Sequence, residues 1–177
     1  MKKVISILFL FLMTFSFAQV KWMTIEEALK AQKVNPKKIL IDFYADWCGP
    51  CKIMDKKTYG HQVIADILNE NYYPVKFNAE EKKTIEIFRR KFSNDNREHR
   101  KGRNSLHEFT QFMNVGAVPS TVFLDEKGNP ITILQGELSA RELEPYLEFI
   151  CKDLFKKIRS REQWEDYQKK FKSKIKD

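Results

Sequence analysis

The sequence predicts an α/β fold in which helices flank a central mixed sheet, with parallel strands at its centre and an antiparallel strand at one edge. Residues 38–45 read KILIDFYA, an almost wholly apolar run typical of a strand that is covered on both faces. Helical and strand-like segments alternate along the chain around this run. Two later strand-like runs are separated only by residues 126–130, EKGNP, which have the composition of a hairpin turn and therefore predict antiparallel pairing.

The first 18 residues have the pattern of a secretion signal. A basic start, Lys2-Lys3, is followed by the mostly apolar residues 4–17 and by small residues at Ser16-Phe17-Ala18. A membrane-spanning helix is the alternative, but the apolar run is shorter than the roughly 20 residues that such a helix needs. We therefore expect cleavage near Ala18, no stable membrane insertion afterwards, and an exported, for example periplasmic, protein.

The mature chain begins with elements that follow one another closely. Thr24-Ile25-Glu26-Glu27 is a capping box that predicts the start of a helix, and Asn35-Pro36 ends it. After the central strand, residues 52–68 have apolar side chains spaced for one buried face of a helix, which Gly60 interrupts. Residues 72–78 are the second predicted strand.

The last part of the predicted core is a hairpin and a helix. Residues 121–125 and 131–135 are the two hairpin strands. Ser139-Ala140-Arg141-Glu142 is a second capping box, and the helix behind it should close the sheet. The apolar residues that recur at helical spacing in this helix are Leu143, Leu147, Ile150, Leu154 and Ile158. We expect one domain over residues 19–150.

Residues 82–108 stand apart by charge, with nine basic and four acidic residues. Apolar spacing predicts two helices on either side of an exposed loop at 93–105. The apolar residues are Ile85, Phe88 and Phe92 in the first helix, and Leu106, Phe109 and Met113 in the second. We interpret this segment as a basic helical insertion, for which a solvated surface is the default interpretation. The specific hypothesis is that it docks an acidic face of a client or electron donor. We expect its histidines, His99 and His107, to be solvated. Glutamine at Arg97, Arg100, Lys101 and Arg103 should then slow exchange with that partner.

Residues 151–177 carry ten basic and five acidic residues and predict a C-terminal helical extension. Ser160 and Gln163 form a capping pair at its start. An apolar stripe follows, made of Trp164, Tyr167, Phe171 and Ile175. We expect the stripe to pack on the domain, with a partner or a membrane surface as the alternative.

Two cysteines, Cys48 and Cys51, lie where the central strand ends and a helix begins. At this spacing on a helix N-terminus they can close a small disulfide without moving the backbone. The positive end of the helix stabilises a thiolate, so we expect the Cys48 sulfur to be exposed, to have a lowered pKa and to attack disulfides. Cys51 lies one turn further in and would resolve the resulting mixed disulfide.

The neighbours of the cysteine pair fit disulfide exchange. Trp47 should shield the site, Gly49 lets a substrate chain approach, and Pro50 suits the first turn of a helix. A redox-active Cys48–Cys51 disulfide needs no cofactor. Two thiolates can also hold copper(I) or half of a zinc site, so metal handling stays an alternative, as does a purely structural disulfide; the three histidines are not at ligand spacing from the pair.

Three further positions carry expectations. Asp42 is the single acid of the apolar strand; a carboxyl buried there has a raised pKa and can exchange protons with Cys51 through water, whereas a surface position is the alternative. A cis peptide at Val118-Pro119 would leave backbone groups free to pair with a bound peptide. Cys151 shares the inward face of the last core helix and should be a buried, inert thiol, with a third redox cysteine or an intermolecular bridge as the alternative.

Four stretches, LIDFYADWCGPCK, VKFNAEE, GAVPSTVFLD and GELSARELEPYLE, resemble thioredoxin. The resemblance covers roughly Trp22 to Ile150. It implies the thioredoxin fold and these roles: a nucleophilic Cys48, a resolving Cys51, a buried proton-relay Asp42, a cis Pro119, Gly136 beside the peptide groove, and Lys76 near the buried acid. The segments 82–108 and 151–177 have no counterpart in a minimal thioredoxin.

The stretch YADWCGPCKIMDKKTY is also similar to the thioredoxin-like domain of DsbD, the membrane reductant that passes electrons to the periplasm. Together with the Gly-Pro pair between the cysteines, this similarity implies a reductase of disulfides in exported proteins, supplied by a membrane electron donor of the DsbD type. A disulfide oxidase or isomerase, and a non-catalytic adaptor or copper-handling protein, are the alternatives. Interleaved acidic and basic residues in an exported protein argue against nucleic acid as a ligand.

Overall fold

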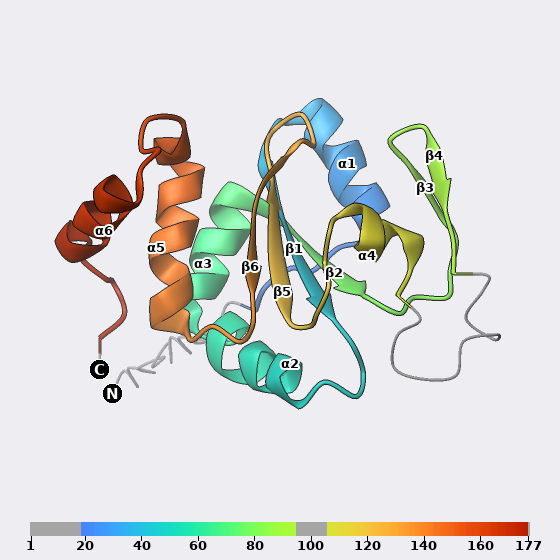
Figure 1. The fold of residues 1–177 in the computed structure, drawn as a ribbon, viewed down its shortest axis with the longest axis horizontal. Coiled ribbons are helices and arrows are strands. Elements are labelled where there is room, and N and C mark those ends of the chain that lie inside the picture. Colours follow the sequence, from blue (N-terminus) through green and yellow to red (C-terminus); the bar gives the residue numbers. More distant parts are fainter. Residues whose placement is uncertain (1–18, 95–105, 177) are drawn as a thin grey trace, which may run out of the picture.

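The computed structural model describes residues 19–94 and 106–176 (Figure 1). The predicted signal segment 1–18 and residues 95–105, which include His99 and the four basic residues singled out above, lie outside the described residues. In chain order the elements are α1 (Ile25–Val34), β1 (Lys38–Tyr44), α2 (Gly49–Met54), the π-helix η1 (Asp55–Tyr59), α3 (Gln62–Asn71), β2 (Tyr72–Asn78), β3 (Ile85–Ile87), β4 (Arg90–Phe92), α4 (Glu108–Phe112), β5 (Ser120–Leu124), β6 (Pro130–Gln135), α5 (Ala140–Cys151), the 3₁₀-helix η3 (Leu154–Lys156) and α6 (Arg161–Lys170).

The main sheet has the strand order β2-β1-β5-β6. β1 pairs in parallel with β2, and β5 is antiparallel to both β1 and β6. The mixed sheet and its hairpin are therefore confirmed. The expectation that antiparallel pairing is confined to one edge is wrong, because the central pair β1–β5 is antiparallel as well. The chain between β2 and β5 re-enters the sheet at the same end at which β2 leaves it, so β5 runs back in the opposite direction.

Two apolar cores cover the two faces of the sheet. Because successive side chains of a strand point to opposite faces, Ile39 and Ile41 of β1 enter one core while Leu40 enters the other. The first core lies against α1, α4 and the β3–β4 pair, and the second lies against α3 and α5 (Figure 1). Burial on both sides is the physical reason for the near-continuous apolar run in β1.

The helix starts follow the sequence closely. Both predicted capping boxes of the core, at Thr24/Glu27 and Ser139/Glu142, are formed. The helix predicted over 52–68 is divided as expected at Gly60, which lies between the end of η1 and the start of α3. A Cβ at Gly60 would lie 2.4 Å from the Lys56 carbonyl oxygen, so only glycine fits this close approach.

The helix predicted from Ile85, Phe88 and Phe92 is wrong, because these residues form the two-stranded β3–β4 hairpin. Ile85 and Phe92 are paired across the hairpin and both are buried. Phe88 and Arg89 connect the strands with φ angles of 53° and 57°. The apolar spacing that mimics a helix arises because two cross-strand partners and a turn residue happen to lie three and four positions apart.

His107 is fully buried and not solvated as expected. It lies at the start of α4, where its Nδ1 accepts the Phe109 N–H at 3.1 Å, and its ring packs on Phe77. Burial lowers the pKa of His107, so the neutral ring caps the helix. The predicted second helix of this segment is confirmed as α4.

The C-terminal extension packs on α5 (Figure 1). Its capping pair at Ser160/Gln163 is formed, and the Trp164 ring lies 4.7 Å from Tyr146 and 4.8 Å from Phe149. The apolar stripe therefore covers the domain, as predicted. α5 ends at Cys151, short of Ile158, and α6 ends before Phe171.

Among the helices in residues 19–94 and 106–176, none combines the length and the apolar character needed to span a bilayer.

Candidate active site

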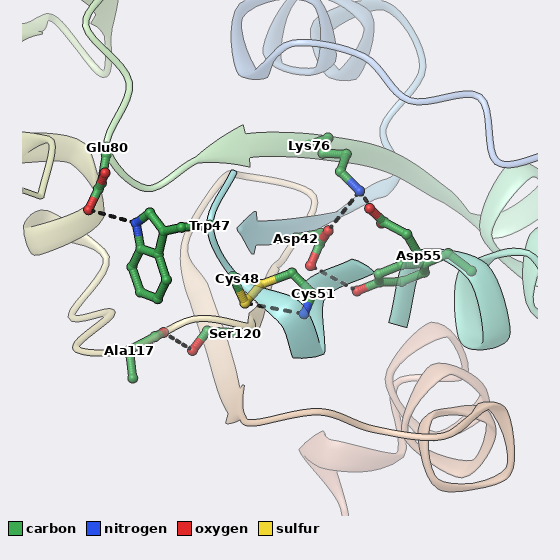
Figure 2. Close-up of a disulfide and its surroundings, with 10 residues drawn as sticks. Asp42, Trp47, Cys48, Cys51, Asp55, Lys76, Glu80, Ala117 and Ser120 are labelled. Carbon is green, nitrogen blue, oxygen red and sulfur yellow. Dashed lines mark hydrogen bonds and ion pairs between the residues drawn. A yellow bond between two sulfur atoms is a disulfide. The ribbon is translucent and has the colours of Figure 1, made fainter. Parts of the chain in front are cut away.

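The candidate site is a disulfide between Cys48 and Cys51 where β1 gives way to α2 (Figure 2). Cys48 is the N-cap residue of α2, with extended backbone angles, and Pro50 lies in the first turn. The sulfurs are 2.08 Å apart and the Cα atoms 5.3 Å apart. The Cys51 backbone N–H donates to the Cys48 sulfur at 3.2 Å. The predicted pairing and position of the two cysteines are thus present.

The Cys48 sulfur is less exposed than expected. Cys48 is 2 % exposed and Cys51 is 4 % exposed, and they pack with Ala45 and the side chains of Tyr44 and Val118. In the closed disulfide each sulfur covers the other, so the prediction of an openly exposed sulfur is wrong for this state. Gly49 and Pro50 lie at the surface beside it.

Trp47 is 51 % exposed and its indole is directed toward the chain that follows β2 (Figure 2). Its Nε1–H donates to Glu80 Oε1 at 3.2 Å. This bond joins the loop before the cysteines to the start of the segment that leads into the β3–β4 hairpin.

Asp42 points to the face of the sheet that carries α2 and η1, and it is 2 % exposed. Loss of water around the carboxylate raises the pKa of Asp42 to about 6, and the nearby Asp55 adds to the rise. Lys76 and a hydrogen bond from Tyr59 act in the opposite direction. The expectation of a buried acid with a raised pKa is confirmed.

Lys76 links two carboxylates. Its Nζ lies 3.4 Å from Asp42 Oδ2 and forms a second ion pair with Asp55 (Figure 2). The ammonium also lies over the rings of Trp22 and Tyr44, at 5.2 and 5.0 Å from their centroids. Lys76 therefore stands beside the buried acid, as the resemblance implied.

Asp55 and Tyr59 are members of this network that the sequence reading missed. Asp55 lies four residues after Cys51, so counting one helical turn could have placed it near the acid. Tyr59 donates its hydroxyl toward Asp42 Oδ1 across 3.4 Å, and no short-range spacing rule points to that contact. A cavity of about 330 Å³ opens beside the network and is lined in part by Asp55, Tyr59 and Lys76.

The Val118–Pro119 peptide bond is cis, as expected. Val118 packs against the cysteine pair, and the Gly136 N–H donates to the Pro119 carbonyl at 2.9 Å. Gly136 has a φ of 97°, a conformation that favours glycine. The structure thus brings Val118, Pro119 and Gly136 together next to the disulfide.

Cys151 lies away from this site, at the end of α5. It is half-buried, not fully buried as expected, and its thiol donates to the Glu148 carbonyl at 3.5 Å. Burial raises the pKa of Cys151, which disfavours the reactive thiolate. Across the described ranges, 19–94 and 106–176, no three histidine, cysteine or acidic side chains form a group that could hold a metal ion.

Comparison with known proteins gives a consistent result. A family model described as thioredoxin-like domain matches residues 25–150. The thiol:disulfide interchange protein DsbD of Colwellia psychrerythraea is 26 % identical over 141 residues, which cover 77 % of this chain but 20 % of that protein. The chain therefore matches only a small part of this relative's length.

Solved structures share the fold. The oxidoreductase DsbH superposes with a TM-score of 0.54 at 19 % identity, covering 80 % of this chain and 88 % of that one. A putative disulphide-isomerase from Bacteroides thetaiotaomicron gives a TM-score of 0.54 at 23 % identity, covering 81 % and 98 % of the two chains.

Proposed function

This chain belongs to the thioredoxin-like domain family, and from that premise we propose that it is a thiol–disulfide oxidoreductase that acts as a reductase of disulfides in exported proteins. The observation that carries the proposal is the Cys48–Cys51 disulfide at the start of α2, with the Cys51 N–H directed at the Cys48 sulfur. The same N–H would stabilise a thiolate on Cys48 once the disulfide is reduced.

The reaction is a two-electron exchange between a dithiol and a disulfide. The Cys48 thiolate attacks one sulfur of the substrate disulfide, which forms a mixed disulfide and releases the first substrate sulfur as a thiolate that takes a proton from water. Cys51 then loses its proton and attacks the Cys48 sulfur. The second substrate thiol leaves with a proton, the substrate is reduced, and the protein disulfide seen in the structure is the product.

We infer that Asp42 takes the proton from Cys51. Its pKa of about 6 means that it is mostly ionised at neutral pH, yet close enough to neutrality to hold a proton briefly. Val118, Pro119 and Gly136 supply the backbone beside the disulfide on which an extended substrate segment would lie.

The reducing direction rests on the Gly-Pro pair between the cysteines and on the similarity to DsbD. We infer that a membrane donor of the DsbD type returns electrons to Cys48 and Cys51. The pattern of residues 1–18 supports export to the periplasm or beyond, with cleavage near Ala18.

Reduction of insulin disulfides tests the proposal directly. The wild-type protein with a chemical reductant should precipitate insulin faster than the reductant alone, and Cys48→Ser should return the rate to that background. Cys151→Ser is the matched control, because it removes a thiol outside the site, and it should keep the wild-type rate. Equal rates for wild type and Cys48→Ser would refute an oxidoreductase that works through this pair.

Redox titration of the Cys48–Cys51 pair tests the direction. A reductase should titrate near −250 mV, clearly below the roughly −180 mV of disulfide isomerases. A midpoint near −120 mV, the range of strong oxidants, would assign the protein to disulfide formation instead. Cys51→Ala should accumulate mixed disulfides on Cys48 and so identify the clients.

A further inference from the structure

Tyr59 is a buried residue whose hydroxyl faces the acid of the site. It is 3 % exposed and is the last residue of η1. The hydroxyl lies 3.4 Å from Asp42 Oδ1 and 3.2 Å from Thr121 Oγ1. Both distances exceed the roughly 2.7–2.8 Å of a firm hydroxyl hydrogen bond, so both contacts are weak, and the single phenolic proton can serve only one of the two neighbours at a time.

The helix geometry places two residues in the network around Asp42. The Gly60 N–H donates to the Asp55 carbonyl at 3.0 Å, a five-residue step that marks a π-helical turn. Asp55 and Tyr59, four residues apart, lie on the same face of this turn. Tyr59 faces Asp42 of β1 and Asp55 faces Lys76 of β2, and π-helical turns of this kind occur often at functional sites.

The other groups around Asp42 are an ion pair, a threonine and the cysteine pair. Lys76 from β2 and Asp55 from η1 carry opposite charges and pair with each other, while Thr121 lies beside Asp42 in the β1–β5 register. The cysteine pair from α2 has no charge as a disulfide. Burial raises the pKa of Tyr59 well above its usual value, so the phenol stays protonated and remains a donor throughout the neutral range.

We propose that Tyr59 is a positioning residue that donates a hydrogen bond from its hydroxyl to the Asp42 carboxylate and so keeps Asp42 ionised and ready to accept the proton of Cys51. This role rests on the proposed function. When Asp42 is ionised, the Tyr59 O–H points to it and Thr121 donates to Tyr59. When Asp42 has taken the proton, the phenol turns to Thr121 and accepts from the acid. The hydroxyl thus adapts to both states without movement of the backbone.

The proton and electron balance follows the exchange reaction. Cys51–SH gives its proton to Asp42 and becomes a thiolate. The thiolate attacks Cys48 in the mixed disulfide, the new Cys48–Cys51 bond forms, and the bond from Cys48 to the substrate breaks. The departing substrate thiolate takes the proton back from Asp42. Tyr59 neither gains nor loses a proton over the cycle.

Tyr59→Phe isolates the hydroxyl, because a phenylalanine ring keeps the edge-on packing against Trp22. The matched control is Tyr72→Phe. Tyr72 is also buried, and its hydroxyl donates to the Leu147 carbonyl at 2.6 Å, on α5. Each variant loses one buried hydroxyl, but only Tyr59→Phe loses it beside Asp42.

The first measurement is the NMR titration of the Asp42 carboxyl carbon in the oxidised protein. The wild type should titrate near 6, as the structure indicates. Tyr59→Phe should raise the midpoint by up to about one pH unit, since a full hydrogen bond to a charged acceptor is worth about that much and this one is long. Tyr72→Phe should leave it in place. An unchanged Asp42 midpoint in Tyr59→Phe would overturn the proposal.

The second measurement separates attack from resolution in the reduced protein. One equivalent of the aromatic disulfide DTNB releases a first coloured thiolate when Cys48 attacks and a second when Cys51 resolves. In Tyr59→Phe the pH profile of the second phase should move upward by the same amount as the Asp42 midpoint, and Tyr72→Phe should follow the wild type. In an Asp42→Asn background, Tyr59→Phe should add no further shift.

Besides an unchanged Asp42 midpoint, two results of the second measurement would contradict the role proposed for Tyr59. A third result would contradict only the proposed function on which that role rests. A second-phase profile that overlays the wild type in Tyr59→Phe, or an equal shift in Tyr72→Phe, would reduce Tyr59 to a packing residue. Absence of both release phases in the wild-type protein would refute the proposed function, while the carboxyl titration would still decide whether Tyr59 controls Asp42.

Discussion

The β3–β4 hairpin and the C-terminal extension are both basic, yet the structure uses their charge in different ways. The hairpin region, residues 82–94, has five basic residues and one acidic residue. Its side chains at Lys82, Arg89 and Lys91 are exposed and form no ion pair within the described residues. Two aromatic rings are exposed there as well, Phe88 at 39 % and Phe112 of α4 at 47 %.

The C-terminal extension neutralises much of its own charge. Lys152 and Lys174 both pair with Glu148, at 2.6 and 2.7 Å. Glu144 is fully buried and accepts from the Lys174 N–H and the Ser173 hydroxyl. The aromatic residues of the extension stack on α5 instead of facing solvent. A count of basic residues therefore does not distinguish a surface that is free to contact a partner from a segment that stabilises the domain. The positions of the acidic residues that pair with the basic ones make that distinction.

The largest expected effect is on stability, through Trp164. Trp164→Ala removes the contacts of the indole ring with Tyr146 and Phe149. It should lower the free energy of unfolding by about 2–3 kcal/mol, less than for a fully buried tryptophan because the side chain is only half-buried. Denaturant titration measures the loss. The rate of insulin reduction per folded molecule should stay at the wild-type value; a lower rate would show that the extension takes part in exchange.

The next largest effect on stability concerns Glu144, the buried acid of α5 that binds the C-terminal extension. Glu144→Ala leaves the Lys174 N–H and the Ser173 hydroxyl without their acceptor and should cost about 2 kcal/mol of stability. Deletion of residues 171–177 should give a loss of similar size, because it removes the same contacts together with the buried Ile175. A loss for Glu144→Ala alone would place the role of Glu144 within α5.

The hairpin should affect rate instead of stability. Lys82→Gln, Arg89→Gln and Lys91→Gln together should slow reduction of a peptide with acidic residues beside its disulfide by about fivefold at low salt, and the difference should shrink at high salt. The control combines Lys169→Gln, Lys172→Gln and Lys176→Gln, three exposed residues of the extension. Equal slowing in both triple variants would mean that only net charge matters.

The smallest effect concerns pH. Lys152 and Lys174 outweigh burial and hold the pKa of Glu148 below its usual value. A carboxyl with a lowered pKa in the folded state contributes stability that is present above its unfolded pKa and is lost as pH falls through its folded pKa. Stability should therefore decline below about pH 4.5. Lys152→Met with Lys174→Met should flatten that decline, as measured by thermal unfolding across pH; an unaltered decline would assign it to other acids.

Much of the site could be predicted from the sequence because its signals are local. The spacing of Cys48 and Cys51 at a strand-to-helix junction places two sulfurs within bonding reach, and an acid inside an apolar strand must be buried. The three capping pairs likewise depend on residues three positions apart. The resemblance then correctly added Lys76 and the cis peptide before Pro119.

The remaining features depend on contacts between distant parts of the chain. Tyr59 reaches Asp42 across 17 residues, and its hydroxyl also meets Thr121, 62 residues away. The β3–β4 hairpin resembles a helix in the sequence because Ile85, Phe88 and Phe92 lie three and four positions apart, and only the pairing of Ile85 with Phe92 in the folded chain selects the hairpin. His107 shows the same limit, since its neutrality comes from packing on Phe77 of β2.

The sequence by itself determined the reactive pair, the buried acid, the helix starts and the β5–β6 hairpin, because each depends on the order of a few neighbouring residues. Only the tertiary structure decided how far the disulfide is covered, which hydroxyl faces Asp42, and which basic segment keeps its charge exposed. Desolvation and charge pairing are set by whatever packs nearby in space, and the neighbours in space are fixed only when the chain folds back on itself.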